Sequence, residues 1–150
     1  MHTKIMDEVV SVSVSSVNGI GFIRSDESLL IIPDEWHKRS IIYDALESEI
    51  ALALEIIPQF FDPEYTDPIL FLQDVRYVCM DSNLAIKTDD SLWIWGNNDF
   101  GQIGDGTTYS RIIPVKVMDN VRSATGRPYR VAISNDGGLC GHGVVCEQCI

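Results

Sequence analysis

The residues best suited to chemistry lie in the last eleven positions of the chain. Three cysteines and one histidine fall within ten residues there, at Cys140, His142, Cys146 and Cys149. Thiolate and imidazole groups are the ligands that zinc prefers, and four of them complete a closed structural site. The intervening glycines would let the chain fold around an ion. These four side chains are therefore one candidate metal centre.

Two other interpretations of this tail stay open. The spacing is not that of a standard pair of zinc knuckles, and a chain end such as residues 144–150 commonly frays, which would leave Cys146 and Cys149 without a ligand role. A redox Cys-x-x-Cys pair needs a helix N-terminus to lower its thiol pKa, and only Ile150 follows Cys149. Because the N-terminus has no signal-peptide core, reduced thiols or metal ligands are expected more than disulfides.

No set of residues predicts catalysis. Gly101 and Gly106 have the glycine spacing of a phosphate-binding loop, but Thr107 stands where that motif requires lysine. Asp89 and Asp90 are adjacent, so on a strand they would point to opposite faces, and both suit a turn. There is no Gly-x-Ser-x-Gly elbow. We expect a non-enzymatic protein with no cofactor other than a possible zinc ion.

Composition limits the class of protein and its partners. With 150 residues, of which 45% are apolar, the chain can bury the core of one domain spanning residues 1–150. A net charge of −11, with only 11 Lys and Arg, argues against binding to nucleic acid phosphates. No apolar run approaches the ~20 residues of a membrane helix. We expect an acidic, soluble, cytoplasmic protein that contacts neither nucleic acid nor membrane.

Internal repeats organise the sequence. Residues 68–75 resemble residues 114–121 at an offset of 46, and residues 85–92 resemble residues 132–139 at an offset of 47. A weaker copy near the N-terminus echoes the same pattern. Periods in the forties are typical of units that bury their apolar face only by stacking on neighbours. The predicted segments are repeat 1 at 4–33, repeat 2 at 68–113, a truncated repeat 3 at 114–143 and the Cys-containing tail at 144–150.

The middle copy carries the clearest local signals. Alternating apolar residues at 84–86 and 92–94 predict two short strands joined by the polar turn 88–91. Residues 93–106 combine two tryptophans with Gly, Asn and Asp, which indicates a tight loop. Pro114 then precedes Val115 and Val117, which we expect to begin the next strand, at a sheet edge or at a strand start.

The stretch Trp93-Ile94-Trp95-Gly96, continued by Gly101-Gln102-Ile103-Gly104 and Gly106, resembles the regulator of chromosome condensation repeat, a blade of β-propellers. The likeness covers roughly residues 69–143, and both flanking copies lack the Gly-Gln-Ile-Gly loop. It implies that the glycines are structural positions. Members of the family act as interaction platforms, including exchange factors for small GTPases and an inhibitor of β-lactamases. Neither activity transfers to this chain, because both use full rings.

Residues 34–62 interrupt the repeats. Apolar residues from Ile42 to Phe61 recur at spacings of three and four, which predicts an amphipathic α-helix that ends near Pro58. This inserted helix would either cap an open end of the stack or dock into a partner.

The predicted fold is mainly β with one inserted α-helix, an incomplete β-propeller-like stack of about three antiparallel blades. Propellers close with roughly four to eight blades, so exposed sheet edges predict self-association. The predicted function is a non-enzymatic interaction module that binds a protein partner through the inserted helix or through blade loops, in particular Asn97, Asp99 and Phe100. The alternatives are a zinc-binding structural or sensing domain and a truncated remnant of a longer repeat protein.

Overall fold

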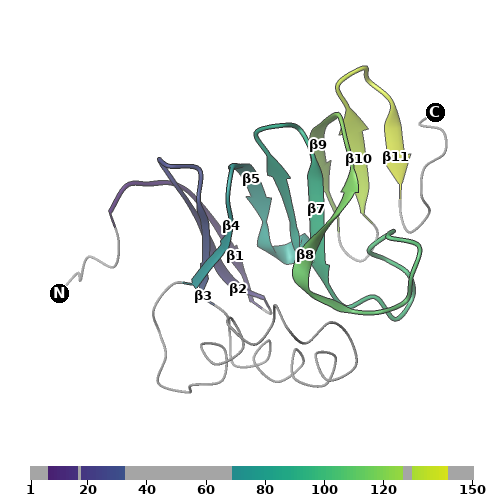
Figure 1. Cartoon of the computed structure of the whole chain (residues 1–150), viewed down its shortest axis with the longest axis horizontal. Coiled ribbons are helices and arrows are strands. Elements are labelled where there is room, and N and C mark those ends of the chain that lie inside the picture. Colours follow the sequence, from purple (N-terminus) through teal and green to yellow (C-terminus); the bar gives the residue numbers. More distant parts are fainter. Residues whose placement is uncertain (1–6, 17, 33–68, 127–129, 142–150) are drawn as a thin grey trace.

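The computed structural model describes residues 7–16, 18–32, 69–126 and 130–141, which form three antiparallel sheets side by side (Figure 1). The first has the order β1-β2-β3-β4, the second β5-β6-β7-β8 and the third β11-β10-β9. The strands are β1 (Val9–Ser15), β2 (Gly19–Arg24), β3 (Leu29–Ile32), β4 (Ile69–Leu72), β5 (Val75–Cys79), β6 (Leu84–Lys87), β7 (Leu92–Gly96), β8 (Arg111–Met118), β9 (Val121–Thr125), β10 (Val131–Ser134) and β11 (Leu139–Gly141). A short 3-10 helix, η1 (Met80–Ser82), joins β5 to β6.

The prediction of a mainly β, propeller-like stack of three antiparallel blades is confirmed. The predicted inserted helix at 34–62 lies outside the described residues. In the part of the chain that the structure describes, no helix is long and apolar enough to cross a bilayer.

The sheets and the sequence repeats do not share boundaries. Strand β4 lies at the start of repeat 2 but pairs with β3, through Leu30 opposite Leu70. Strand β8 begins at the end of repeat 2 and runs into repeat 3, and it pairs with β7. Each four-stranded sheet is thus completed by a strand that leads into the next sheet.

Strand register repeats from one sheet to the next. In the hairpins β2–β3, β6–β7 and β10–β11, the pairs next to the turn are equivalent: Ile23 with Leu29, Ile86 with Leu92 and Ile133 with Leu139. The strand before each hairpin, β1, β5 or β9, pairs with the first hairpin strand in the same register: Val12 with Phe22, Val78 with Ala85 and Ala124 with Ala132. In all three sheets the pairing skips one residue of that strand, namely Val10, Arg76 or Arg122, as a β-bulge. The sequence repeat is therefore a true structural repeat.

The hairpin turns are also built alike. Glu27, Asp90 and Gly137 have φ values of 64°, 63° and 93° at equivalent positions. One residue earlier, Asp26, Asp89 and Asp136 each accept a hydrogen bond from the amide two residues ahead. Such Asx turns hold the left-handed residue in place. Hydrogen bonds from the Ser28, Ser91 and Ser134 hydroxyls are the main reason that the pKa values of these three carboxyls are lowered.

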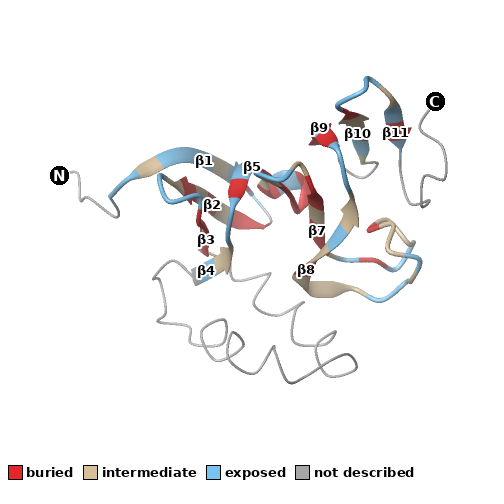
Figure 2. Ribbon diagram, turned by 45° about the horizontal axis from the view of Figure 1, so that its top comes forward, coloured by how far each residue is buried: buried red, intermediate tan, exposed pale blue. Residues whose placement is uncertain are grey.

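Two apolar clusters fill the spaces between the sheets, where the buried residues gather (Figure 2). The first joins residues of the first and second sheets: Ile23, Leu29, Ile31, Val75, Val78, Met80, Ala85 and Trp95. The second joins the second and third sheets: Leu84, Ile86, Leu92, Ile94, Ile103, Val121, Ala124 and Ala132. We call the contact between two neighbouring sheets a junction. A backbone hydrogen bond crosses each junction, from Val75 N–H to the Glu27 carbonyl (2.7 Å) and from Val121 N–H to the Asp90 carbonyl (2.8 Å).

Two local predictions were wrong. Strand β7 extends to Gly96, so residues 93–96 belong to a strand and the loop begins only at Asn97. Strand β8 begins at Arg111, so it starts before Pro114 and the two valines, although it does lie at the sheet edge, as the other part of that prediction stated. A proline is tolerated there because β8 pairs with β7 alone, and the pairing is irregular between Ile94 and Gly96.

Candidate functional site

The loop that connects β7 to β8, residues 97–110, is built around the side chain of Asn98, which is fully buried. Its Oδ1 atom accepts a hydrogen bond from the Ile103 amide (2.8 Å), and its Nδ2 group donates to the carbonyls of Thr107 (2.9 Å) and Tyr109 (3.0 Å). One amide side chain therefore joins the outgoing and returning halves of the loop. This arrangement fixes the conformation of a segment that has no regular secondary structure.

Asp105 provides a second internal support. Its Oδ1 atom accepts hydrogen bonds from the amide (3.0 Å) and hydroxyl (2.8 Å) of Thr107, and its Oδ2 atom contacts the Arg111 guanidinium at 2.7 Å. Burial raises the pKa of this carboxyl, but the hydrogen bonds from Thr107 and Arg111 outweigh it, and the pKa is lowered overall. Asp105 is thus a structural carboxylate and not a proton donor at neutral pH.

Arg130, just before β10, attaches the loop to the rest of the molecule. Its Nε atom donates to the Ser82 carbonyl (3.0 Å) and its Nη1 atom to the Gln102 carbonyl (2.6 Å). Burial lowers the pKa of this guanidinium. Because Ser82 belongs to η1, Arg130 connects the loop, the second sheet and the approach to the third.

The three residues predicted to bind a partner lie together on the exposed side of the loop. Asn97 Nδ2 donates to Asp99 Oδ2 (2.8 Å), and Asn97 Oδ1 accepts from Gln102 Nε2. Gln102 Oε1 in turn accepts from the Phe100 amide (2.9 Å). The Phe100 side chain is 86% exposed. The polar residues hold one another, and an aromatic ring is left facing the solvent.

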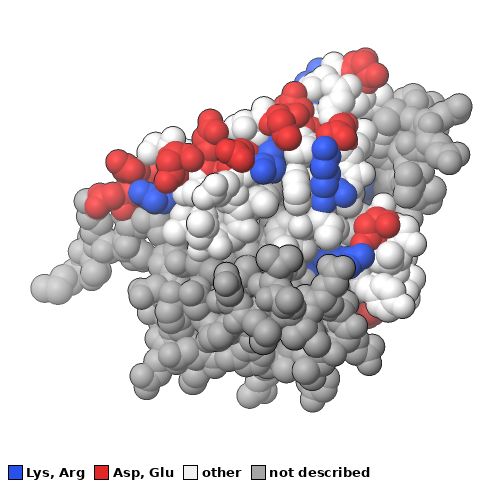
Figure 3. All heavy atoms as spheres, viewed as in Figure 1, with Lys and Arg blue, Asp and Glu red and all other residues white. Residues whose placement is uncertain are grey.

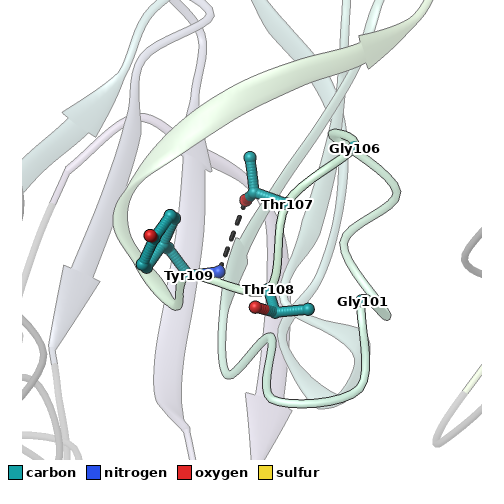
Figure 4. Close-up of a pocket in the computed structure, with 5 residues that line it drawn as sticks. All are labelled: Gly101, Gly106, Thr107, Thr108 and Tyr109. Carbon is teal, nitrogen blue, oxygen red and sulfur yellow. Dashed lines mark hydrogen bonds between the residues drawn. The ribbon is translucent and has the colours of Figure 1, made fainter.

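A depression of about 470 Å³ opens beside the returning half of the loop (Figure 4). It is lined by Gly101, Gly106, Thr107, Thr108 and Tyr109. Gly101 and Gly106 have φ values of 68° and 80°, in keeping with the structural role that the resemblance implied for the loop glycines. The lining contains hydroxyl, aromatic and backbone groups and no carboxylate, imidazole or thiol. Such a surface can bind another molecule by shape and hydrogen bonding.

The predicted metal site is not assembled among the described residues. Cys140 lies on β11, 5% exposed and opposite Ala132, at the position equivalent to Trp93. It is disulfide-bonded, so in this state its sulfur is not a thiolate ligand. His142, Cys146 and Cys149 lie outside the described residues. Across residues 7–16, 18–32, 69–126 and 130–141, no three or more His, Cys, Asp or Glu side chains are grouped to hold a metal ion. The zinc site stays a prediction.

Sequence reasoning missed the two residues that organise the loop. Asn98 is adjacent to Asn97 and identical in type, so composition could not tell the buried amide from the exposed one. Arg130 is 28 residues from the Gln102 carbonyl that it binds. Only the stacking of the third sheet on the second brings them together.

The comparisons with known proteins agree with this geometry. The family model of the regulator of chromosome condensation (RCC1) repeat matches residues 89–132, which run from the β6–β7 turn through the loop to β10. These residues form an RCC1 repeat. The fold is likewise that of RCC1-type propellers: yeast RCC1 (Prp20), in its crystal structure with Kap60, superposes with a TM-score of 0.62 at 22% identity, over 94% of this chain and 31% of that one. Human WBSCR16 gives a TM-score of 0.61 at 17% identity, over 95% and 35% of the two chains.

Curated relatives match over shorter stretches. The RCC2 homologue of Danio rerio is 35% identical over 44% of this chain, and the ultraviolet-B receptor UVR8 of Arabidopsis thaliana is 33% identical over 51%. The matched regions make up 16% and 19% of those two proteins. RCC1-like propeller folds commonly mediate protein interaction, and this chain provides a part of such a fold.

Proposed function

We propose that this chain is a non-enzymatic interaction module that binds a protein partner through the loop at 97–110. The observation that carries the proposal is an aromatic side chain, Phe100, held 86% exposed on a loop whose base is fixed by buried hydrogen bonds. Exposed aromatic rings on rigid supports lose little conformational entropy on binding, and aromatic residues are over-represented among interface hot spots. Tyr109, 63% exposed on the returning half of the loop, adds a second such ring.

The relatives make a protein partner the most reasonable class. Yeast RCC1 (Prp20) was crystallised bound to Kap60, and binding of Prp20p to Gsp1p and histones has been examined together with its structure. Those partners belong to those proteins. The acidic composition of this chain, with a net charge of −11, also favours a protein partner over nucleic acid.

The proposal is tested by capturing partners from lysate with the immobilised chain, identifying the main captured protein and measuring its Kd against variants. Phe100→Ala should raise the Kd at least about tenfold, which corresponds to 1.4 kcal/mol. Val10→Ala is the matched control, because it shortens an apolar side chain that is 66% exposed on the first sheet, away from the loop. If both variants bind as the parent does, the loop is not the binding surface, and the segment 34–62 becomes the next region to truncate.

A further inference from the structure

Both ends of the stack present apolar faces to solvent. On the side of the first sheet that faces away from the second, Arg24 lies at the end of β2 and pairs with Glu8 and Asp26. The rest of that side carries a group of apolar side chains, which we call the N-terminal end face: Val12, Val14, Ile20, Phe22, Leu30 and Leu70. They are direct cross-strand neighbours, with Val12 opposite Phe22, Phe22 opposite Leu30 and Leu30 opposite Leu70. Val12, Val14 and Leu70 are 55%, 63% and 50% exposed.

The opposite end of the stack is apolar as well. Val131 and Leu139 are 39% and 57% exposed, and Ile133 lies directly opposite Leu139 across the β10–β11 pair. We call these three residues the C-terminal end face. A face of this kind, rimmed by polar turns, marks an interaction surface in a soluble protein.

The strand register shows what each end face is equivalent to. Ile133 and Leu139 occupy the positions of Ile86 and Leu92, which are buried against the third sheet. Val12 and Phe22 occupy the positions of Ala124 and Ala132, which form the other half of that same junction.

The two end faces are therefore the two halves of the junction that the chain already forms twice internally. The N-terminal end face therefore matches the C-terminal end face, and two copies of the same end face do not form such a junction.

We infer that the occupant of each end face is a second copy of this chain, docked head to tail, so that the C-terminal end face of one copy packs on the N-terminal end face of the other. Two copies supply six sheets, and closed propellers contain roughly four to eight blades. Two identical head-to-tail junctions then close the ring. A closed ring leaves neither apolar face exposed, whereas an open chain of copies would grow into a filament.

The internal junctions also predict which polar groups would form hydrogen bonds at the junction between two copies. At the second junction, Val121 N–H donates to the Asp90 carbonyl at 2.8 Å, and Arg76 Nη2 donates to the Val121 carbonyl at 2.6 Å. The equivalent pairs between copies are Val9 N–H with the Gly137 carbonyl, and Arg122 with the Val9 carbonyl. Arg122 is exposed and occupies the same bulge position as Arg76.

Sedimentation equilibrium of the full chain tests the inference. We expect a mass of twice 16.8 kDa at micromolar concentration. Val12→Asp and Leu139→Asp each place an unpaired charge on one end face, and each should weaken dimerisation by on the order of 100-fold or more. Thr108→Asp, which adds the same charge on the loop and on neither end face, should leave the mass of the dimer unchanged.

Mixing the two face variants distinguishes head-to-tail from face-to-face docking. The Val12→Asp chain keeps an intact C-terminal end face, and the Leu139→Asp chain keeps an intact N-terminal end face, so an equimolar mixture should recover dimers that neither variant forms alone. Circular dichroism must show that both variants remain folded. A parent that stays at 16.8 kDa at every concentration would overturn the inference, as would a mixture that stays monomeric.

Discussion

Replacing Asn98 by alanine should destabilise the chain far more than replacing its neighbour Asn97. The Asn98 side chain is 0% exposed and holds three short hydrogen bonds to the backbone. Asn98→Ala leaves the amide of Ile103, a residue that is only 2% exposed, without its acceptor. The carbonyls of Thr107 and Tyr109 lose a donor but belong to more exposed residues, so water can replace part of that loss.

The magnitude follows from counting those groups. A buried polar group without a partner costs about 1–3 kcal/mol, so one orphaned amide and two partly compensated carbonyls give a loss of about 2–4 kcal/mol in the free energy of unfolding. For a chain of this length that corresponds to a fall in Tm of about 5–12 °C. Asn97 makes its hydrogen bonds in solvent, so Asn97→Ala should cost less than about 1 kcal/mol.

Urea unfolding of the two variants, followed by tryptophan fluorescence, measures the difference directly. Asn98→Asp sharpens the test, because it keeps the acceptor for Ile103 but points a carboxylate at two carbonyls and toward Asp105 Oδ1, now 3.3 Å from Nδ2. It should be at least as unstable as Asn98→Ala at pH 7. If Asn97→Ala and Asn98→Ala differ by less than about 0.5 kcal/mol, the loop does not depend on this buried amide and our reasoning is wrong.

Three further predictions concern other parts of the molecule. Gly96→Ala should cost more than 1–2 kcal/mol in thermal unfolding, since φ is 95° and the new Cβ would lie 2.5 Å from Asn83 Nδ2, whereas Gly106→Ala, with φ 80° and open space, should cost about 1 kcal/mol. Asp105 has a lowered pKa in the fold, so its ionised form contributes stability that is complete above about pH 4, the pKa of an unfolded carboxyl, and is lost as the pH falls through the folded pKa. Asp105→Asn should therefore flatten the acid side of the stability profile, and an unchanged profile would contradict this assignment. Elemental analysis of reduced protein should find close to one zinc per chain if the four Cys and His side chains of the tail form a site, and finding none would reject it.

The repeat pattern predicted the stack of sheets because each copy carries its own hairpin. Ile86 and Leu92 show the reason: they are separated by a polar turn and recur as Ile133 and Leu139, so the same pairing had to form twice. What the pattern could not predict is which strand completes each sheet. Residues 68–75 and 114–121 are similar in sequence, and similarity does not reveal that β4 turns back onto β3.

The candidate site was only partly predictable for a related reason. The exposure of Phe100 follows from a run of turn-forming residues around it, which leaves little for an aromatic ring to pack against. The burial of Asn98 depends on the path of the whole loop, and the role of Arg130 depends on how the third sheet stacks. The start of β8 was predicted too late in the chain, because an edge strand can accommodate Pro114 in its interior, where an inner strand would exclude a proline.

Most of the acidic side chains visible in Figure 3 follow the upper rim of the stack, with Lys and Arg side chains between them, and a few others lie apart at the lower right of the view. The boundaries of the repeats and of the sheets differ, and this difference bears on how the stack can gain or lose sheets. Each four-stranded sheet takes its last strand from the segment that leads into the next sheet. Removal of one repeat copy would therefore transfer that strand to a different sheet. Because the register is the same in every copy, the new sheet accepts it. Duplication or loss of one repeat copy thus changes the number of sheets by one complete sheet. A chain cut at the boundary between two copies would instead separate a strand from the sheet that it completes.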